Sequence, residues 1–448
     1  MNIYRIFIVI SFLFSILLNQ ISIVDLFLLF IDAYLSIRIS LMYPFKLNLA
    51  KYTVQLVYWI SFILMPSFRL VDHLIQLNAT EISDIDYVRL LSFGSKVLFI
   101  VNAFWLFIGA RKSNNIVRSK YEPFIMKDSL VTNIFIFMFA LSIFSYSIGL
   151  SRMGGEEVAL PFHMSGVINI IRISVFPFLF SVICENYLIR KKKIPSRFLI
   201  LFFVWGLLEV FVRLSKSALV FSFIFAILVF LLYERNSYKK VLKLSFPLVF
   251  LFFFLYPIIE AMRDIDGKDL KQSFIMASSN VNSDESSRSL LKPLNRVFMI
   301  PSYFIKDYKY VDHDSFFDFS NTPALLAMGG AARYQTVEID GFSLGAGQSS
   351  GTTGIQDPLL HGGYGLCYIT VVLLFLFARF VDGFEKKKMY SIYVFLLYNT
   401  FFFVNNVNIS YLYDGTGLPT IFLGVISIFI AYYFNFRKKL PLIVKTTR

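Results

Sequence analysis

Apolar runs long enough to cross a lipid bilayer recur along most of this 448-residue chain. A helix rises about 1.5 Å per residue, so roughly 17 to 22 apolar residues span the hydrocarbon core. The chain is 57% hydrophobic and 16% charged, more apolar surface than a water-soluble core can bury. The sequence therefore predicts an all-α polytopic integral membrane protein with about twelve transmembrane helices. The twelve runs lie near residues 4–21, 24–44, 53–70, 91–110, 129–150, 166–188, 198–213, 217–234, 244–262, 362–381, 389–408 and 416–436.

Lysines and arginines gather in alternate connections between these runs, and all of these connections fall on one side when twelve spans are counted. Basic loops stay in the cytoplasm, so this side and both termini are predicted to be cytoplasmic. The net charge of +14 then reflects orientation and contact with anionic lipid heads, and nucleic acid is not an expected partner. The basic connections are residues 111–120, 190–197, 235–243, 386–388 and 437–439.

One long segment, residues 263–361, separates nine predicted spans from the last three and falls on the outer side. We therefore predict transmembrane helices 1–9 in residues 1–262, a large periplasmic loop in 263–361, and three more helices with a cytoplasmic tail in 362–448. Apolar and charged residues at helical spacing within the loop indicate short amphipathic helices. The chain shows no internal repeat, which argues against a transporter built from two matching halves.

The loop sequence "GFSLGAGQSSGTTGIQDPLLHGGYG" (341–365) is rich in glycine and hydroxyl residues, as phosphate-binding loops often are. It contains no lysine or arginine and follows no strand, so we exclude a nucleotide site. Two interpretations of its last part stay open. Gly362, Gly363 and Gly365 either allow close approach to neighbouring segments, or they open a helix start where Asp357 and His361 face a substrate.

Cations on the predicted outer side indicate an anionic ligand. Arg172 lies almost two turns inside an apolar run, where a charge is costly and usually faces a cavity. Glu209 and Arg213 are four residues apart and can neutralise each other at the membrane edge. Guanidinium groups match phosphate oxygens, so a lipid-linked diphosphate is the expected ligand. The candidate diphosphate-binding residues are Arg172, Arg213, Lys216, Arg296 and Arg333.

Signatures of other chemistries are missing from the sequence. It has no G-x-S-x-G, no H-E-x-x-H and no cluster of cysteine and histidine. Its two cysteines, Cys184 and Cys367, both lie in apolar segments, which argues against a disulfide framework. We expect neither a metal nor another cofactor.

Three short motifs carry a resemblance to a known family. They are "LSKSALV" (214–220), like a G-S-R-G-A-L-L turn; "LLKPLNRVFMI" (290–300), with an arginine in apolar context; and "QDPLLHGGYGLCYI" (356–369), like G-E-A-x-x-N-F-G-x-x-G. With the span layout and the large loop, they resemble the Wzy-type repeat-unit polymerases of O-antigen and capsule assembly. The chain departs from the pattern at Lys216, where the turn usually has arginine, so either Lys216 or Arg213 takes the phosphate-binding role.

The resemblance implies a GT-C-like glycosyltransferase of the bacterial inner membrane, acting in lipopolysaccharide biosynthesis. It would transfer the growing glycan from undecaprenyl diphosphate to the next lipid-linked repeat unit. The expected partners are that lipid-linked oligosaccharide, membrane lipid and a chain-length regulator. The cations would stabilise the diphosphate leaving group, and Asp357 or His361, with Glu209 behind them, would be the base. A flippase or other transporter of lipid-linked glycans, and an O-antigen ligase, are the alternatives.

Overall fold

The described part of the chain consists of helices and short connections between them. The computed structural model describes residues 2–19, 21–67, 84–109, 127–150, 160–161, 164–191, 193–213, 315–328, 356–386 and 389–406, with a few isolated positions between 228 and 334. No strand occurs within these ranges. Among them, four helices are long and apolar enough to cross a membrane: Val88–Ile108, Asp128–Ser147, Met164–Leu188 and Asp357–Glu385.

Nine of the predicted runs correspond to helical segments in the described ranges. The first two runs form separate helices. Ser22 is the N-cap of the second helix, and its side chain accepts a hydrogen bond from the Asp25 N–H. Runs 217–234, 244–262 and 416–436 lie essentially outside the described residues, so the total of twelve remains a prediction. The helical segments are α1 (Asn2–Leu18), α2 (Ile23–Met42), η1 (Phe45–Asn48), α3 (Leu49–Tyr58) with η2 (Trp59–Leu64) and α4 (Met65–Ser67), α6 (Asp84–Gly109), α7 (Asp128–Ser147), α8 (Met164–Ile170) with η4 (Ile171–Val175) and α9 (Phe176–Lys191), α10 (Ser196–Arg213), α15 (Thr322–Met328), α17 (Gln356–Lys386) and α18 (Tyr390–Asn406).

Large apolar side chains cover the outside of these helices. Leu17 is 77% exposed, Ile23 is 86% exposed and Phe107 is 87% exposed. Along α17, an exposed stripe runs through Ile369, Leu373 and Phe380. Apolar surface of this extent is unfavourable in water and normal where hydrocarbon is the solvent. The described helices therefore indicate a membrane protein.

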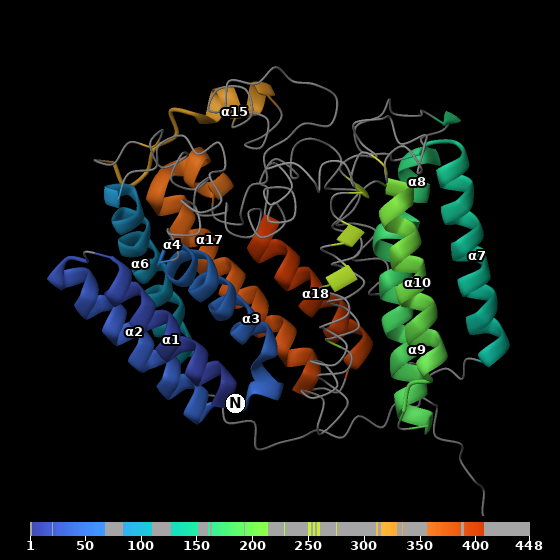
Figure 1. Ribbon diagram of the computed structural model, residues 1–448, viewed down its shortest axis with the longest axis horizontal. Helices are drawn as coiled ribbons and strands as arrows, with labels where there is room; N and C mark the ends of the chain where they lie inside the picture. The colour runs from blue at the N-terminus through green and yellow to red at the C-terminus, as the bar shows by residue number, and fades with distance from the viewer. Residues whose placement is uncertain are drawn as a thin grey trace, which may run out of the picture.

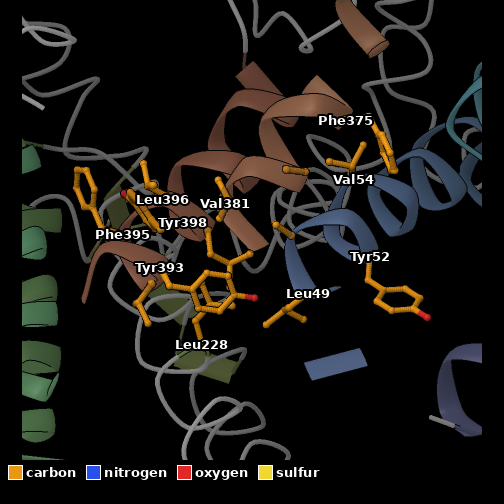
Figure 2. Packing of buried hydrophobic residues seen from close by; sticks show 14 of the residues in the cluster. Leu49, Tyr52, Val54, Leu228, Phe375, Val381, Tyr393, Phe395, Leu396 and Tyr398 are labelled. Atoms are coloured by element: carbon orange, nitrogen blue, oxygen red, sulfur yellow. The ribbon is translucent and has the colours of Figure 1, made fainter. Parts of the chain in front are cut away.

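The helices form two groups joined by a central pair (Figure 1). One group holds α1, α2, α3 and α6, and the other holds α7, α9 and α10. Between them, α17 packs on α3 and α6, while α18 packs on α17, α3 and α9. Figure 2 shows the apolar core where these elements meet, with Leu49 of α3, Val381 of α17 and Tyr393 of α18.

Two carboxylates anchor helix starts across this junction. Asp382 of α17 accepts a hydrogen bond from the backbone N–H of Ala50 at 2.9 Å and lies 3.9 Å from the Lys51 ammonium. Glu185 of α9 accepts from the backbone N–H groups of Tyr390 and Ser391 at 3.0 and 3.2 Å. The first N–H groups of a helix have no partner within the helix, so these carboxylates satisfy them and complement the helix dipole. The starts of α3 and α18 are thereby fixed to α17 and α9.

Candidate functional site

A buried ion pair forms the centre of the candidate site. Arg172 is 0% exposed and Glu209 is 2% exposed. The Nε of Arg172 donates to Oε1 of Glu209 at 2.9 Å, and Nη2 donates to Oε2 at 2.7 Å. This two-pronged contact satisfies a charge that the sequence places inside an apolar helix. The spacing of four residues predicts a pair of Glu209 with Arg213. That electrostatic interaction is present, and packing in addition brings Arg172 of η4 within hydrogen-bond distance of the Glu209 carboxylate.

Ser142 of α7 and Trp205 of α10 hold the carboxylate in position. The hydroxyl of Ser142 on α7 donates to Oε1 of Glu209 at 2.5 Å, and Trp205 Nε1 donates to that hydroxyl at 3.2 Å. The Nη1 group of Arg172 has no hydrogen-bond partner among the described residues, so it is available to donate to a ligand. The segments η4, α7 and α10 thus orient the Arg172–Glu209 pair by hydrogen bonds.

A second cation lies beside this pair. Arg213, the last residue of α10, is half-buried and interacts electrostatically with Glu209, Arg172 and Tyr398 of α18. Among the described residues, two guanidinium groups therefore share one carboxylate, which gives these three side chains together a net positive charge. Such a cluster in an apolar bundle favours an anionic ligand.

The backbone at Arg172 is irregular and borders a groove. Ile171–Val175 form a π-helical turn, η4, a distortion frequently found at functional sites. A groove of about 410 Å³ lies between this turn and α7. Its surface is almost wholly apolar, and Phe137 on its rim is 58% exposed. The groove lining is Asn133, Ile134, Phe137, Met138, Ile171, Val175, Phe176 and Leu179.

A second polar pair lies at the start of α17. Asp357 and His361 are buried, and Nε2 of His361 lies 3.6 Å from Oδ1 of Asp357. The sequence predicts a loop up to residue 361, but α17 begins at Gln356 and is kinked at Gly362 and Gly363. The four-residue spacing of Asp357 and His361 places both on one face of this first turn. In Figure 1 the start of α17 and the region of α8 lie at the same end of the bundle.

The glycines of this kink accept a segment from the large loop. Gly363 has a φ of +65°, and a Cβ there would lie 2.9 Å from the backbone N of Asp318. A Cβ on Gly365 would lie 2.6 Å from ring atoms of Phe317, and the Gly365 N–H donates to the Phe316 carbonyl at 2.7 Å. The prediction that these glycines permit close approach is confirmed. The alternative, that the start of α17 also faces a substrate, remains a prediction.

Three of the candidate cations, Lys216, Arg296 and Arg333, lie outside the described residues. Tyr334, a loop aromatic of the kind that stacks on sugar rings, is buried with Leu325 and Leu360 and donates to Asn321 at 3.3 Å. That environment favours a packing role. Among the described residues, no group of three histidine, cysteine or acidic side chains could hold a metal ion.

Two residues of the site, Ser142 and Trp205, are not predictable from the sequence. Neither stands out, because serine and tryptophan are common in apolar helices and nothing in their spacing refers to Glu209. Comparison with known protein families, with curated protein sequences and with solved structures found no match. Function must therefore be inferred from the residues themselves.

Proposed function

We propose that this protein is a membrane-embedded glycosyltransferase that polymerises lipid-linked oligosaccharide repeat units, as the Wzy-type resemblance implies. The observation that carries the proposal is the cluster of Arg172, Glu209 and Arg213. It combines two guanidinium groups with one carboxylate, buried in an apolar bundle and adjacent to an apolar groove. A lipid-linked diphosphate joins an anionic head to a long hydrocarbon chain, and both parts match this arrangement.

The geometry along α7 supports this match. Ser142, which contacts Glu209, lies four residues beyond Met138 and nine beyond Asn133, the ends of the α7 groove lining. At about 1.5 Å per residue, the groove therefore extends roughly 6 to 14 Å along α7 from the level of the charged cluster. A phosphate held by Arg172 Nη1 and Arg213 would leave the attached hydrocarbon chain room to follow this groove.

The proposed reaction is a displacement at the anomeric carbon of the donor glycan. A hydroxyl oxygen of the acceptor repeat unit forms the new bond, and the bond from that carbon to the diphosphate oxygen breaks. The leaving diphosphate keeps the electron pair, and Arg172 and Arg213 stabilise its charge without any change in protonation. Glu209 holds Arg172 in the required orientation and is not free to act as a base.

The acceptor proton needs a base, and we assign this role to His361, with Asp357 orienting its ring. The 3.6 Å approach of His361 Nε2 to Asp357 Oδ1 supports this pairing. A carboxylate beside an imidazole both orients the ring and stabilises its protonated form. Asp357 itself would be the base if the histidine can be replaced without loss of transfer.

Gene deletion in a strain that makes a polymeric surface glycan tests the function. Loss of long chains with retention of a single repeat unit on the lipid A core is expected for a polymerase. Loss of all surface glycan, with lipid-linked material accumulating inside the cell, would instead indicate a flippase. Accumulation of finished polymer on its lipid carrier would indicate a ligase. An unchanged glycan ladder would contradict all three.

A further inference from the structure

A second buried polar network lies in the other helix group, and its acidic member has no role in the proposed reaction. Asp32, in the middle of α2, is 0% exposed. The side-chain nitrogen of Asn102 on α6 donates to Asp32 Oδ1 at 3.1 Å. The other carboxyl oxygen, Oδ2, has no hydrogen-bond partner among the described residues. A lone ionised carboxylate in such a site is very costly unless a cation compensates it.

The cations of the surrounding helices are engaged elsewhere or exposed. Arg5 of α1 donates to Ser40, and Lys51 of α3 pairs with Asp382. Three further cations near this group, Arg38 of α2 and Arg89 and Lys96 of α6, are exposed. The other described titratable side chains of these helices are Asp25 at the start of α2 and the tyrosines Tyr4, Tyr34, Tyr52 and Tyr58, and none of them carries a positive charge.

The hydrogen bonds of the network run in one direction and end at Asp32. The Tyr4 hydroxyl donates to Gln55 Oε1 at 2.5 Å, and Gln55 Nε2 donates to Asn102 Oδ1 at 2.5 Å. The Asn102 amide then donates to Asp32. Each amide uses its oxygen to accept and its nitrogen to donate, so Asp32 is the terminal acceptor of the chain.

The oxygens near Asp32 are already occupied by N–H donors. Ser36, one turn further along α2, accepts from Gln55 Nε2 at 3.0 Å and from Trp59 Nε1 at 3.1 Å. Asn102 Oδ1 accepts from Gln55, as described above. A sodium ion needs several free oxygen ligands, and this network presents donors in their place. A proton on Oδ2 needs no ligand shell and removes the charge.

We propose that Asp32 is a proton-binding site, with the proton held on Oδ2 in the native protein at neutral pH. The proposal is independent of the proposed function, because it rests on the α1–α2–α3–α6 group and on none of the residues of the charged cluster. Release of the proton leaves an uncompensated carboxylate between α2 and α6. Proton binding at Asp32 is therefore coupled to the packing of these two helices.

Infrared difference spectroscopy on the full-length protein in lipid nanodiscs tests the site. The wild-type minus Asp32→Asn spectrum at neutral pH should contain the C=O stretch of one protonated carboxyl group. The matched control is Asp382→Asn, whose difference spectrum should contain ionised carboxylate bands, because Asp382 pairs with Lys51. Asp32→Glu should retain a protonated band at a shifted frequency, which keeps the test valid if Asp32→Asn folds poorly. Ionised carboxylate bands for Asp32 would overturn the proposal.

Thermal unfolding gives a second readout. The native state holds Asp32 protonated while the unfolded chain ionises it, so the unfolded state binds fewer protons at neutral pH. Stability therefore falls as pH rises, and the Tm of wild type should drop by several degrees relative to Asp32→Asn between about pH 6 and about pH 9. A Tm difference that does not change with pH would contradict the proposal. A rise in the wild-type Tm with sodium chloride over choline chloride, absent in Asp32→Asn, would indicate a cation site instead.

Discussion

Arg172 and Glu209, 37 residues apart in the chain, share two hydrogen bonds of 2.9 and 2.7 Å, and both side chains are buried. The pair joins η4 to α10, and Ser142 extends the contact to α7. It therefore has a structural role in addition to the proposed role in holding a diphosphate. Variants of the pair must be designed to separate these two roles.

Removal of one partner should destabilise the protein. Arg172→Ala removes both guanidinium hydrogen bonds of the buried Glu209 carboxylate and leaves it only the half-buried Arg213 as a cation, and should lower the free energy of unfolding by about 3–5 kcal/mol. The double variant Arg172→Met/Glu209→Leu should recover much of this stability, because neither fully buried member of the pair is left without its partner and the remaining cation, Arg213, is only half-buried. Unfolding of the purified protein in detergent measures both. Destabilisation of the double variant equal to the sum of the effects of Arg172→Met and Glu209→Leu alone would show that the pair is not coupled.

The same variants test the role in catalysis. The double variant should fold and yet fail to extend glycan chains, because the donor to the diphosphate is lost with Arg172. The measurement is the glycan ladder of a deletion strain complemented with each variant, at matched expression. Wild-type ladders from a stably folded double variant would remove Arg172 from the mechanism and leave it a structural residue.

The groove beside η4 can be filled. Val175→Trp should reduce chain extension by about tenfold or more, because a lipid chain displaced from the groove misplaces the attached diphosphate. The matched control is Ile136→Trp on α7, where the side chain is 61% exposed and does not line the groove. A similar loss in both variants would indicate a general effect of tryptophan, and no loss in Val175→Trp would exclude the groove as the lipid path.

Gly363 at the kink of α17 should not tolerate a side chain. Its φ is +65°, and a Cβ at this position would lie 2.9 Å from the backbone N of Asp318. Gly363→Ala should therefore cost about 1–3 kcal/mol. Gly383, in the same helix, has no atom within 4 Å of a Cβ position, so Gly383→Ala should be neutral or stabilising by about 1 kcal/mol. Thermal unfolding of the two variants compares them directly, and equal effects would contradict the described kink.

Sidedness can be measured with thiol labelling. Cys184 and Cys367 are free and buried, so the background should be low. Ser320 and Lys193 are both exposed. An impermeant maleimide should label Ser320→Cys in cells whose outer membrane has been permeabilised, and should label Lys193→Cys only after lysis. Labelling of both from one side would refute the predicted orientation.

The sequence by itself determined two properties: that the apolar runs suit a lipid environment, and that the secondary structure is helical. Apolar runs of membrane-spanning length admit few solutions other than helices, since backbone groups in hydrocarbon must bond within their own segment. The close approach at Gly362, Gly363 and Gly365 was also predictable, because small residues crowded at a helix start leave room for another segment. These properties depend on local composition, which is visible in the chain.

Only the tertiary structure decided which charges meet. The i, i+4 spacing suggested Glu209 with Arg213, and these two side chains do interact electrostatically, but only packing brings Arg172 from another helical segment to hydrogen-bond the same carboxylate. Likewise, Asp32, Asn102 and Gln55 look like isolated polar residues in the sequence, and Asp382 and Glu185 do not reveal which helix starts they satisfy. A buried polar group takes whatever partner its neighbouring helices supply, and local sequence does not encode which helices become neighbours.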